Sequence, residues 1–294
     1  MRLAITANPN KPRALALVRR TIEILAGRAE VVVAEEAAQL LDHPGPRAPL
    51  ESIAADVLVA IGGDGTFLTA LQRSALPILP VNAGTVGFLA EVDGDDETAF
   101  TAALERLVGG QFFVESRMKL ASAVRREPLP DATNEIVVHT SQVAKMRRFE
   151  VSVDGQPVGR LHADGVIVAT PTGSTSYAMS ALGPILDPAI EGIVVTALAP
   201  FRAPQRAVVI DPLRSVGVRL LTPAKDGVVV IDGQREVKLP GGEEVVAYRS
   251  PRPAMFVRFG SRFFHRLQGK RILPWTEESV DGDPRDDADL PAHP

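Results

Sequence analysis

A glycine-rich turn that carries a single carboxylate is the part of this sequence best equipped for chemistry. An apolar run, residues 57–61, leads directly into Gly62-Gly63-Asp64-Gly65-Thr66. Glycines where a strand turns into a helix let backbone N–H groups approach a phosphate, and the positive end of the helix dipole favours an anion there. A carboxylate repels phosphate, so Asp64 must serve another purpose. It can bind a metal ion that bridges to the phosphates, or it can accept the proton of a hydroxyl that attacks them.

Two other interpretations of this turn have to be considered. A P-loop mechanism is excluded, because the Gly-Lys-Ser/Thr sequence of a P-loop is missing. A tight turn in which Asp64 only caps the following helix is the purely structural alternative. The choice between that alternative and a phosphate site depends on the other motifs of the chain.

A second turn, at residues 170–176, is rich in hydroxyl groups and also joins an apolar run to an expected helix. Its hydroxyls come from Thr170, Thr172, Ser174, Thr175 and Ser176. Hydroxyls beside the amides of a helix start can bind a ribose, a phosphate or an amide, whereas capping the helix needs only one or two of them. This turn therefore predicts a second ligand-binding surface.

The Asn134-Glu135 pair, placed just before another apolar run, is suited to a sugar. The carboxylate accepts hydrogen bonds and the amide both donates and accepts them, so the pair can bind the vicinal hydroxyls of a ribose. His162 and Asp164 precede the hydroxyl-rich turn. The five histidines are scattered without metal-ligand spacing, and His162 on its own gives no reason to assign it chemistry.

Composition and charge exclude several classes of protein. The 294 residues carry a formal charge of −4, and residues 276–294 contribute −6 through seven acidic residues and one arginine, which leaves +2 for residues 1–275. A nearly neutral body with one Trp and two Tyr favours small anionic ligands and predicts no nucleic-acid partner. The absence of cysteine excludes disulfides, thiol catalysis and zinc–thiolate sites. No apolar run approaches the roughly 18 residues of a membrane span, so we expect a cytoplasmic protein without a membrane partner.

Strands and helices alternate in the first third of the chain, which predicts a Rossmann-like α/β domain with a parallel sheet over residues 1–110. Strands are expected at residues 2–7, 30–34, 57–61 and 77–81, and helices at 13–25, 66–73 and 96–107. Ligands of such sheets bind at the carboxyl ends of the strands, so we expect them at residues 62–65 and 82–88.

Beyond residue 110 the pattern changes to short β-branched runs separated by turn signals such as Asp232-Gly233. This change predicts a β-rich, β-sandwich-like domain over residues 111–253 with a single helix at 175–182. Residues 254–275 are expected to return to the N-terminal domain, and the acidic segment 276–294 is expected to be disordered.

Three motifs, taken in sequence order, closely resemble the NAD kinase family. They are the glycine turn 62–66, the pair Asn134-Glu135, and Asp164-Gly165 followed by Thr170-Pro171-Thr172-Gly173-Ser174-Thr175-Ser176-Tyr177. The glycine turn alone is similar to those of phosphofructokinases and of diacylglycerol and sphingosine-type lipid kinases. The other two motifs distinguish NAD kinase, and the resemblance covers roughly residues 55–235.

The resemblance implies an N-terminal α/β domain and a C-terminal β-rich domain with the site between them. It implies a phosphotransferase that moves the terminal phosphoryl group of ATP to the 2′-hydroxyl of the adenosine ribose of NAD, giving NADP. A divalent metal ion, expected to be Mg²⁺, takes part, and its ligands are unknown. The resemblance leaves open whether polyphosphate can replace ATP as the donor and whether NADH can replace NAD as the acceptor. The resemblance also implies a homodimer or a homotetramer.

Roles for individual residues follow from the same resemblance. Asp64 matches the base that activates the ribose hydroxyl, Phe88 the aromatic residue near the adenine, and Asn134 with Glu135 the pair that binds a ribose. Asp164 matches an acid near the nicotinamide end that often reaches the site of a neighbouring subunit. The residues expected to bind nucleotide are Gly63, Asp64, Gly65, Thr66, Phe88, Asn134, Glu135, His162, Asp164, Thr172, Thr175, Ser176, Tyr177, Ser180, Ala199 and Gln234.

Two departures from the family pattern concern the walls of the expected pocket. Ala199-Pro200-Phe201-Arg202-Ala203 stands where the family often has Pro-His-Ser-Leu, and Ser176 stands where alanine is usual. Neither departure removes a residue expected to take part in the chemistry.

Two other functions compete with NAD kinase. A lipid kinase of the diacylglycerol or sphingosine type would use the same glycine turn, but it needs a route to the membrane, and no amphipathic or basic surface segment is evident. A non-catalytic dinucleotide sensor would have no need of Asp64 among the phosphates.

Overall fold

The computed structural model describes residues 1–84, 87–201, 206–260, 263–270 and 272. The chain divides into two compact units, Met1–Phe259 and Gly260–Pro294. The described part of the second unit contains helix α6 (Phe263–Gly269), and the other helices and strands lie in the first unit. The predicted acidic tail and the family departures at Arg202 and Ala203 lie outside the described residues.

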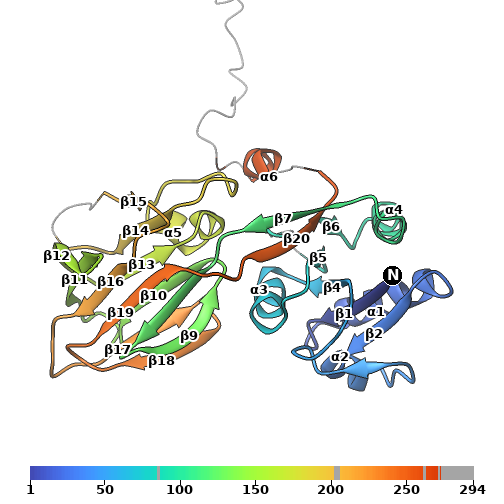
Figure 1. The fold of residues 1–294 in the computed structure, drawn as a ribbon, viewed down its shortest axis with the longest axis horizontal. Helices are drawn as coiled ribbons and strands as arrows, with labels where there is room; N and C mark the ends of the chain where they lie inside the picture. Colours follow the sequence, from blue (N-terminus) through green and yellow to red (C-terminus); the bar gives the residue numbers. More distant parts are fainter. Residues whose placement is uncertain (85–86, 202–205, 261–262, 271, 273–294) are drawn as a thin grey trace, which may run out of the picture. The chain divides into compact units, whose positions relative to one another are not determined.

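A largely parallel sheet is built mainly from the N-terminal part of the first unit (Figure 1). Its strand order is β3-β2-β1-β4-β5-β20-β7, and β6 also pairs with β5. Its strands are β1 (Arg2–Ala7), β2 (Glu30–Ala34), β3 (Arg47–Ala48), β4 (Val57–Gly62), β5 (Ile78–Asn82), β6 (Val92–Asp93), β7 (Phe113–Arg117) and β20 (Ala254–Arg258). All paired neighbours are parallel except β7, which runs antiparallel to β20. The predicted Rossmann-like parallel sheet is confirmed.

Helices cover both faces of this sheet, which explains why its central strands are apolar at successive positions. Leu3 and Ile5 pack in the cluster that includes α1 (Pro12–Leu25) and α4 (Glu97–Val108), whereas Ala4 packs in the cluster that includes α3 (Asp64–Arg73). Alternate residues of β4 divide between the two clusters in the same way. A short helix, α2 (Glu35–Leu40), follows β2.

Two six-stranded antiparallel sheets form a sandwich in the rest of the unit (Figure 1). Their orders are β15-β14-β13-β10-β17-β18 and β12-β11-β16-β19-β8-β9. The strands are β8 (Leu120–Val124), β9 (Glu127–Ala132), β10 (Glu135–Thr140), β11 (Arg147–Val153), β12 (Gln156–Ala163), β13 (Gly165–Ala169), β14 (Ile193–Leu198), β15 (Val208–Ile210), β16 (Val216–Leu220), β17 (Gly227–Ile231), β18 (Arg235–Leu239) and β19 (Glu244–Arg249). The core lies between the sheets, where Ile136 and Val138 of one share a buried cluster with Phe149 and Val218 of the other.

Several elements differ from the sequence-based expectation. Strands β7, β8, β9, β12 and β18 were not indicated by the pattern, and all except β8 lie at the edge of a sheet. Edge strands face water along one side and tolerate charged residues and proline, so the apolar signal is weak. The expected helix at 175–182 is a 3₁₀ turn, η1 (Thr172–Thr175), followed by the short helix α5 (Tyr177–Ser180).

The last strand of the first unit returns to the N-terminal sheet. Strand β20 pairs with β5 on one side and β7 on the other. The domain boundaries themselves stay predictions. No helix in the described part of the chain is both long and apolar enough to cross a membrane.

Candidate active site

The carboxylate of Asp64 is held by a neighbouring loop. Gly63 caps α3, and Asp64 is the first residue of that helix. Its Oδ2 accepts the N–H of Phe88 at 2.9 Å, and its Oδ1 accepts the N–H of Leu89 at 3.3 Å. A Cβ added to Gly87 would overlap this carboxylate, so only glycine lets the loop pass so closely. Capping of its own helix does not account for Asp64, because both oxygens bond a different segment.

Lys11 brings a positive charge to the same turn. Its Nζ lies 3.8 Å from the position that a Cβ would take on Gly63, and 3.8 Å from the corresponding position on Gly84. The connection after β1 is fixed there because the Asn8 N–H donates to the carbonyl of Ile61, at the end of β4, at 3.0 Å. Sequence reasoning missed Lys11, since a single lysine belongs to no motif. Its place just after the carboxyl end of a parallel strand was the available signal.

The hydroxyl-rich turn packs directly against the Asn134-Glu135 pair. The Thr170 N–H donates to the carbonyl of Asn134 at 2.8 Å, and the Thr170 hydroxyl donates to the carbonyl of Thr133 at 2.6 Å. A Cβ added to Gly173 would overlap the backbone of Asn134, so glycine permits the close approach of the two segments. Two of the three motifs singled out in the sequence therefore form one surface.

Most of the hydroxyls that suggested this surface hold the turn itself together. The Ser174 hydroxyl donates to the carbonyl of Pro171 at 2.7 Å, and the Thr175 hydroxyl donates to the carbonyl of Thr172 at 3.2 Å. By contrast, the Ser176 hydroxyl donates to Oε1 of Glu135 at 3.2 Å. Tyr177 and Ser180 lie exposed on α5.

The Asn134-Glu135 pair offers two buried oxygens that lack partners. Glu135 is only 5 % exposed, and its Oε2 and the Oδ1 of Asn134 have no hydrogen-bond partner among the described residues. Burial, reinforced by the charge of Asp232, raises the pKa of Glu135 to about 7, although the Ser176 hydroxyl and the Tyr177 N–H oppose the shift. Buried acceptors without donors are rare, and here they suit a ligand that carries hydroxyl groups.

Asp232 fixes the backbone of this pair. Its carboxylate accepts the N–H groups of Thr133 at 2.9 Å, Asn134 at 2.7 Å and Glu135 at 3.2 Å. Burial raises the pKa of Asp232 even though these three amides favour the charged form. Sequence reasoning used Asp232 only as a turn signal. Its partners lie about 100 residues earlier in the chain, so no local pattern indicated the contact.

The turn that carries Asp232, residues 232–234, also makes hydrogen bonds to helix α3. We call this turn the clasp. The Gln234 amide donates to the carbonyl of Gly65 at 2.7 Å, and its Oε1 accepts the Thr69 hydroxyl at 2.8 Å. The Gln72 amide donates to Asp232 at 3.4 Å. The clasp therefore holds the Asn134-Glu135 pair on one side and α3, the helix that begins at the glycine turn, on the other. Gln234, expected to bind nucleotide, bonds α3 in this structure.

Three of the expected site residues lie apart from this assembly. Strands β10 and β13 pair from Glu135 with Ala169 at one end to His139 with Gly165 at the other, a span of roughly 14 Å at the usual rise per residue. Asp164 and Ala199 lie at the far end from Glu135, where the Asp164 N–H donates to the carbonyl of Leu198 at 3.0 Å. His162 is exposed nearby, and its ring contacts Phe201 edge-on.

Two family models match this chain. The ATP-NAD kinase N-terminal domain matches residues 3–112, and the ATP-NAD kinase C-terminal domain matches residues 133–259. An NAD kinase of Thermoplasma volcanium is 36% identical over 272 residues, which cover 92% of this chain and 98% of that protein. The chain belongs to the NAD kinase family.

Two solved structures of NAD and NADH kinases are similar to this one. An NAD kinase from Archaeoglobus fulgidus in complex with ATP has a TM-score of 0.73 at 32% identity, covering 92% of this chain and 98% of that chain. Yeast NADH kinase complexed with NADH has a TM-score of 0.85 at 21% identity over 96% and 90% of the two chains, which shows the shared fold. The predicted family, fold class and phosphotransferase activity are confirmed, and neither the lipid kinase nor the sensor is favoured.

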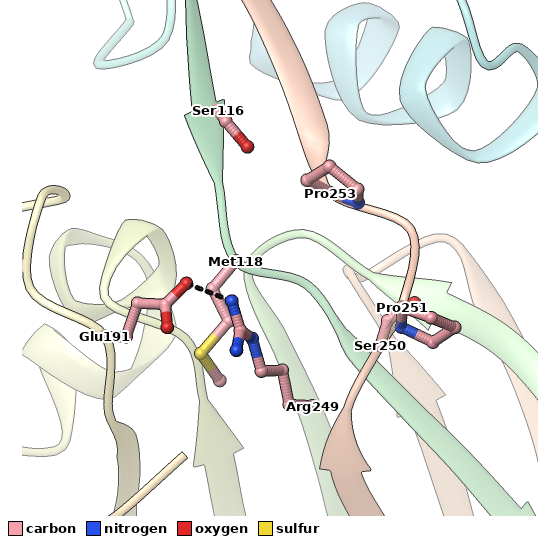
Figure 2. Close-up of a pocket in the computed structure, with 7 residues that line it drawn as sticks. All are labelled: Ser116, Met118, Glu191, Arg249, Ser250, Pro251 and Pro253. Carbon is pink, nitrogen blue, oxygen red and sulfur yellow. Dashed lines mark hydrogen bonds and ion pairs between the residues drawn. The ribbon is translucent and has the colours of Figure 1, made fainter. Parts of the chain in front are cut away.

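A cavity of about 480 Å³ in this NAD kinase lies away from the assembly just described (Figure 2). It forms at the two connections between the sheets, where β7 leads into β8 and β19 leads into β20, and Arg249 reaches across it to an ion pair with Glu191. None of the residues drawn there is an expected site residue. A second cavity borders Gly65 and Thr66 of the glycine turn.

Proposed function

We propose that this NAD kinase binds the adenosine ribose of NAD at Asn134 and Glu135 and transfers the terminal phosphoryl group of ATP to its 2′-hydroxyl, giving NADP. The observation that carries the proposal is the pair of buried oxygens without partners, Asn134 Oδ1 and Glu135 Oε2. Ribose hydroxyls supply the missing donors. The clasp keeps this pair next to α3, whose first residue is Asp64.

Asp64 acts as the general base of the transfer. A ribose hydroxyl is a poor nucleophile at neutral pH, so the carboxylate accepts its proton as the hydroxyl oxygen attacks the γ-phosphorus. The bond from the γ-phosphorus to the bridging oxygen breaks, and ADP leaves. The amides of the glycine turn and the ammonium of Lys11 offset the negative charge on the transferred group.

The residues at the turn fit a metal ion that arrives with the donor phosphates. Among the described residues, no group of three or more His, Asp and Glu side chains could hold a metal ion by itself. Mg²⁺ keeps several waters and is usually bound by one or two carboxylates together with substrate phosphates. Asp64, together with the buried Asn82 Oδ1 that has no partner among the described residues, would provide the protein contacts. The ion would offset phosphate charge.

A homo-oligomer would give a role to the residues at the far end of the strands. His162, Asp164 and Ala199 lie about one strand length from Glu135, and we propose that they complete the site of a neighbouring subunit in a homodimer or homotetramer. Light scattering gives the subunit number. The predicted cytoplasmic location is part of the same proposal and is checked by cell fractionation.

The proposed function is tested by assaying NADP formation. NAD and NADH are each combined with ATP and with polyphosphate, in the presence of Mg²⁺ and after its removal by a chelator. We expect NADP from NAD and ATP only when Mg²⁺ is present. Tight binding of NAD without NADP formation, or phosphorylation of diacylglycerol or sphingosine instead, would contradict the proposal.

Replacing Lys11 is expected to weaken use of the phosphoryl donor. Lys11→Met should lower kcat/KM for ATP by roughly tenfold to a hundredfold, because the charge near the phosphates is lost while the aliphatic stem is kept. The KM for NAD should change little. Steady-state kinetics with Arg19→Met as the matched control on α1 checks this, since Arg19 is exposed farther along the helix. Equal values of kcat/KM for ATP in the two variants would show that Lys11 does not act on the phosphoryl donor.

Binding of NAD is expected to depend on pH through Glu135. The pKa of this carboxyl is raised to about 7, and only the ionised form offers both oxygens to ribose hydroxyls. The KM for NAD should therefore rise by up to about tenfold for each pH unit below 7. Glu135→Gln should have a higher KM that no longer changes over this range. A parallel pH dependence in the variant would assign the titration to another group.

The same raised pKa lowers the stability of the ligand-free protein. Below the ordinary value of 4.5 the carboxyl is protonated in both the folded and the unfolded protein. Between about 4.5 and about 7 the folded protein retains the proton that the unfolded chain has released, so stability falls as the pH rises. Glu135→Gln should accordingly melt at a higher temperature than the wild type at pH 8, and thermal denaturation at pH 5 and pH 8 measures the difference.

A further inference from the structure

The loop that holds the carboxylate of Asp64 is bonded in turn to a buried arginine. This loop, residues 87–91, donates the N–H of Leu89 to Oδ1 of Asp64 at 3.3 Å. The carbonyl of Leu89 accepts a hydrogen bond from Nη1 of Arg258 at 3.0 Å. Leu89 itself is buried. One residue of the loop therefore links the proposed general base to an arginine that lies 169 residues further along the chain than Leu89.

The guanidinium of Arg258, at the end of β20, is fixed by charged and aromatic neighbours. Its Nε contacts Oε2 of Glu115, on β7, at 2.8 Å, and its Nη1 lies 3.2 Å from Oε2 of Glu91 in the loop. The guanidinium carbon lies 4.7 Å from the centre of the Phe256 ring. Because a guanidinium is planar, these neighbours fix the direction in which it donates to the loop.

The far end of the loop is bonded to the same strand. Glu91 is buried, and its Oε1 accepts the N–H of Phe259, the residue after Arg258, at 2.9 Å. The N–H of Glu91 donates to the carbonyl of Pro80, on β5, at 2.8 Å. Strand β20 and the residue after it therefore hold loop 87–91 at two points, one of them the residue that bonds Asp64.

Charge balance alone does not explain the bond from Arg258 to the loop backbone. The buried cluster is neutral without it, since it consists of two arginines and two glutamates: Arg117, Arg258, Glu91 and Glu115. The hydrogen bond to the Leu89 carbonyl adds orientation rather than neutralisation. Orientation matters at a general base, because a displacement of about 1 Å can cost a hundredfold in rate.

We propose that Arg258 is a positioning residue for the phosphoryl transfer. By holding the carbonyl of Leu89, it fixes the loop whose N–H groups orient the carboxylate of Asp64 toward the attacking hydroxyl. The proposal rests on the general-base role of Asp64 argued above and adds a residue that acts through it. Arg258 touches neither nucleotide and takes no part in the proton transfer.

The experiment is a double-mutant cycle between Arg258 and Asp64, with kcat for NADP formation as the readout. Arg258→Lys keeps the positive charge beside the two carboxylates but lacks the planar fork that also reaches the Leu89 carbonyl. It should lower kcat by about tenfold or more and leave the dissociation constant for NAD within about threefold. In the Asp64→Asn background the same substitution should lower kcat by less than about twofold, because no base is left to orient.

Phe149→Leu is the control for lost stability, because Phe149 is fully buried in the core of the sandwich rather than against the loop. It should melt at a lower temperature than the wild type and keep kcat within about twofold. Thermal melts set an assay temperature at which every variant is folded. If Arg258→Lys does not fold, Glu91→Gln takes its place in the cycle, since it weakens the hold on Arg258 and leaves the contact with Glu115. Its kcat should fall about threefold in the wild-type background only.

The outcomes distinguish the proposal from the function on which it rests. A loss of kcat in Arg258→Lys that disappears in the Asp64→Asn background supports a positioning role. Additive losses, a loss no larger than that of Phe149→Leu, or a raised KM for NAD at unchanged kcat would overturn it. Unchanged turnover in Asp64→Asn alone would instead contradict the proposed base, and the positioning role with it, whatever the effect of Arg258→Lys.

Discussion

Asp64→Asn is expected to lower the turnover of NADP formation by roughly 10²–10⁴-fold, the usual contribution of a general base. The amide keeps the size of the side chain and can still accept one of the two N–H groups that now hold the carboxylate, from Phe88 and Leu89. It cannot accept the proton of the attacking hydroxyl. The dissociation constant for NAD should stay within about threefold, because the partners of the ribose, Asn134 and Glu135, are untouched.

The control for this variant is Asp56→Asn, because Asp56 immediately precedes β4, at the end of the strand opposite to the glycine turn. Its carboxylate accepts the N–H of Arg2 at 2.7 Å and lies far from the glycine turn along the strand. Single-turnover kinetics separates the chemical step from product release, and calorimetry measures NAD binding. If Asp64→Asn keeps turnover close to that of the control, Asp64 is not the base.

Arg258→Met is expected to cost about 3–5 kcal/mol of folding stability, the largest effect on stability that we predict. The Arg258 side chain is 4% exposed and contacts Glu91 at 3.2 Å and Glu115 at 2.8 Å. Its guanidinium also donates to the carbonyl of Leu89 at 3.0 Å and stacks on the ring of Phe256. The substitution removes the guanidinium that compensates the buried carboxylate of Glu91, and this loss destabilises the folded protein.

Chemical denaturation of Arg258→Met measures the change in the free energy of unfolding. Arg219→Met is the matched control, because Arg219 also sits on a strand and pairs with a glutamate, Glu244, but its side chain is 46% exposed. That variant should lose less than about 1 kcal/mol. The double variant Glu91→Gln with Arg258→Met should recover part of the loss, since the uncompensated charge is gone. Equal losses in the two single variants would contradict a buried, stabilising network at Arg258.

The sequence predicted the central strands well because burial on both faces makes them continuously apolar. Strands at 2–7 and 30–34 match β1 and β2 at both ends. The edge strands β9 and β12 were missed, since one exposed edge allows β9 to contain two prolines and β12 to be exposed along most of its length. Periodicity reports burial, so elements that are mostly exposed escape it.

The candidate site was predictable where its chemistry lies in short motifs, and not where it depends on contacts between distant segments. The glycine turn, the Asn134-Glu135 pair and the hydroxyl-rich turn were each visible locally. Lys11 and the clasp were not, because a lone lysine and an Asp-Gly turn acquire meaning only from what folds against them. A local motif can also mislead. The hydroxyls of Ser174 and Thr175 suggested ligand binding in the sequence, but in the structure they donate to backbone carbonyls of their own turn.

The position of β20 has a consequence for how the protein is made. Phe256 of β20 pairs with Ile78 of β5, and Val257 pairs with Val114 of β7, so the N-terminal sheet is completed by a strand that follows the whole sandwich in the sequence. A nascent chain that ends near residue 110 leaves β5 without its partner at Ile78 and leaves an uncovered patch around Leu89 and Ala90, which share a buried cluster with Phe256. Such long-range pairing slows folding and prolongs exposure of that edge. The N-terminal sheet therefore stays incomplete until β20 has been synthesised.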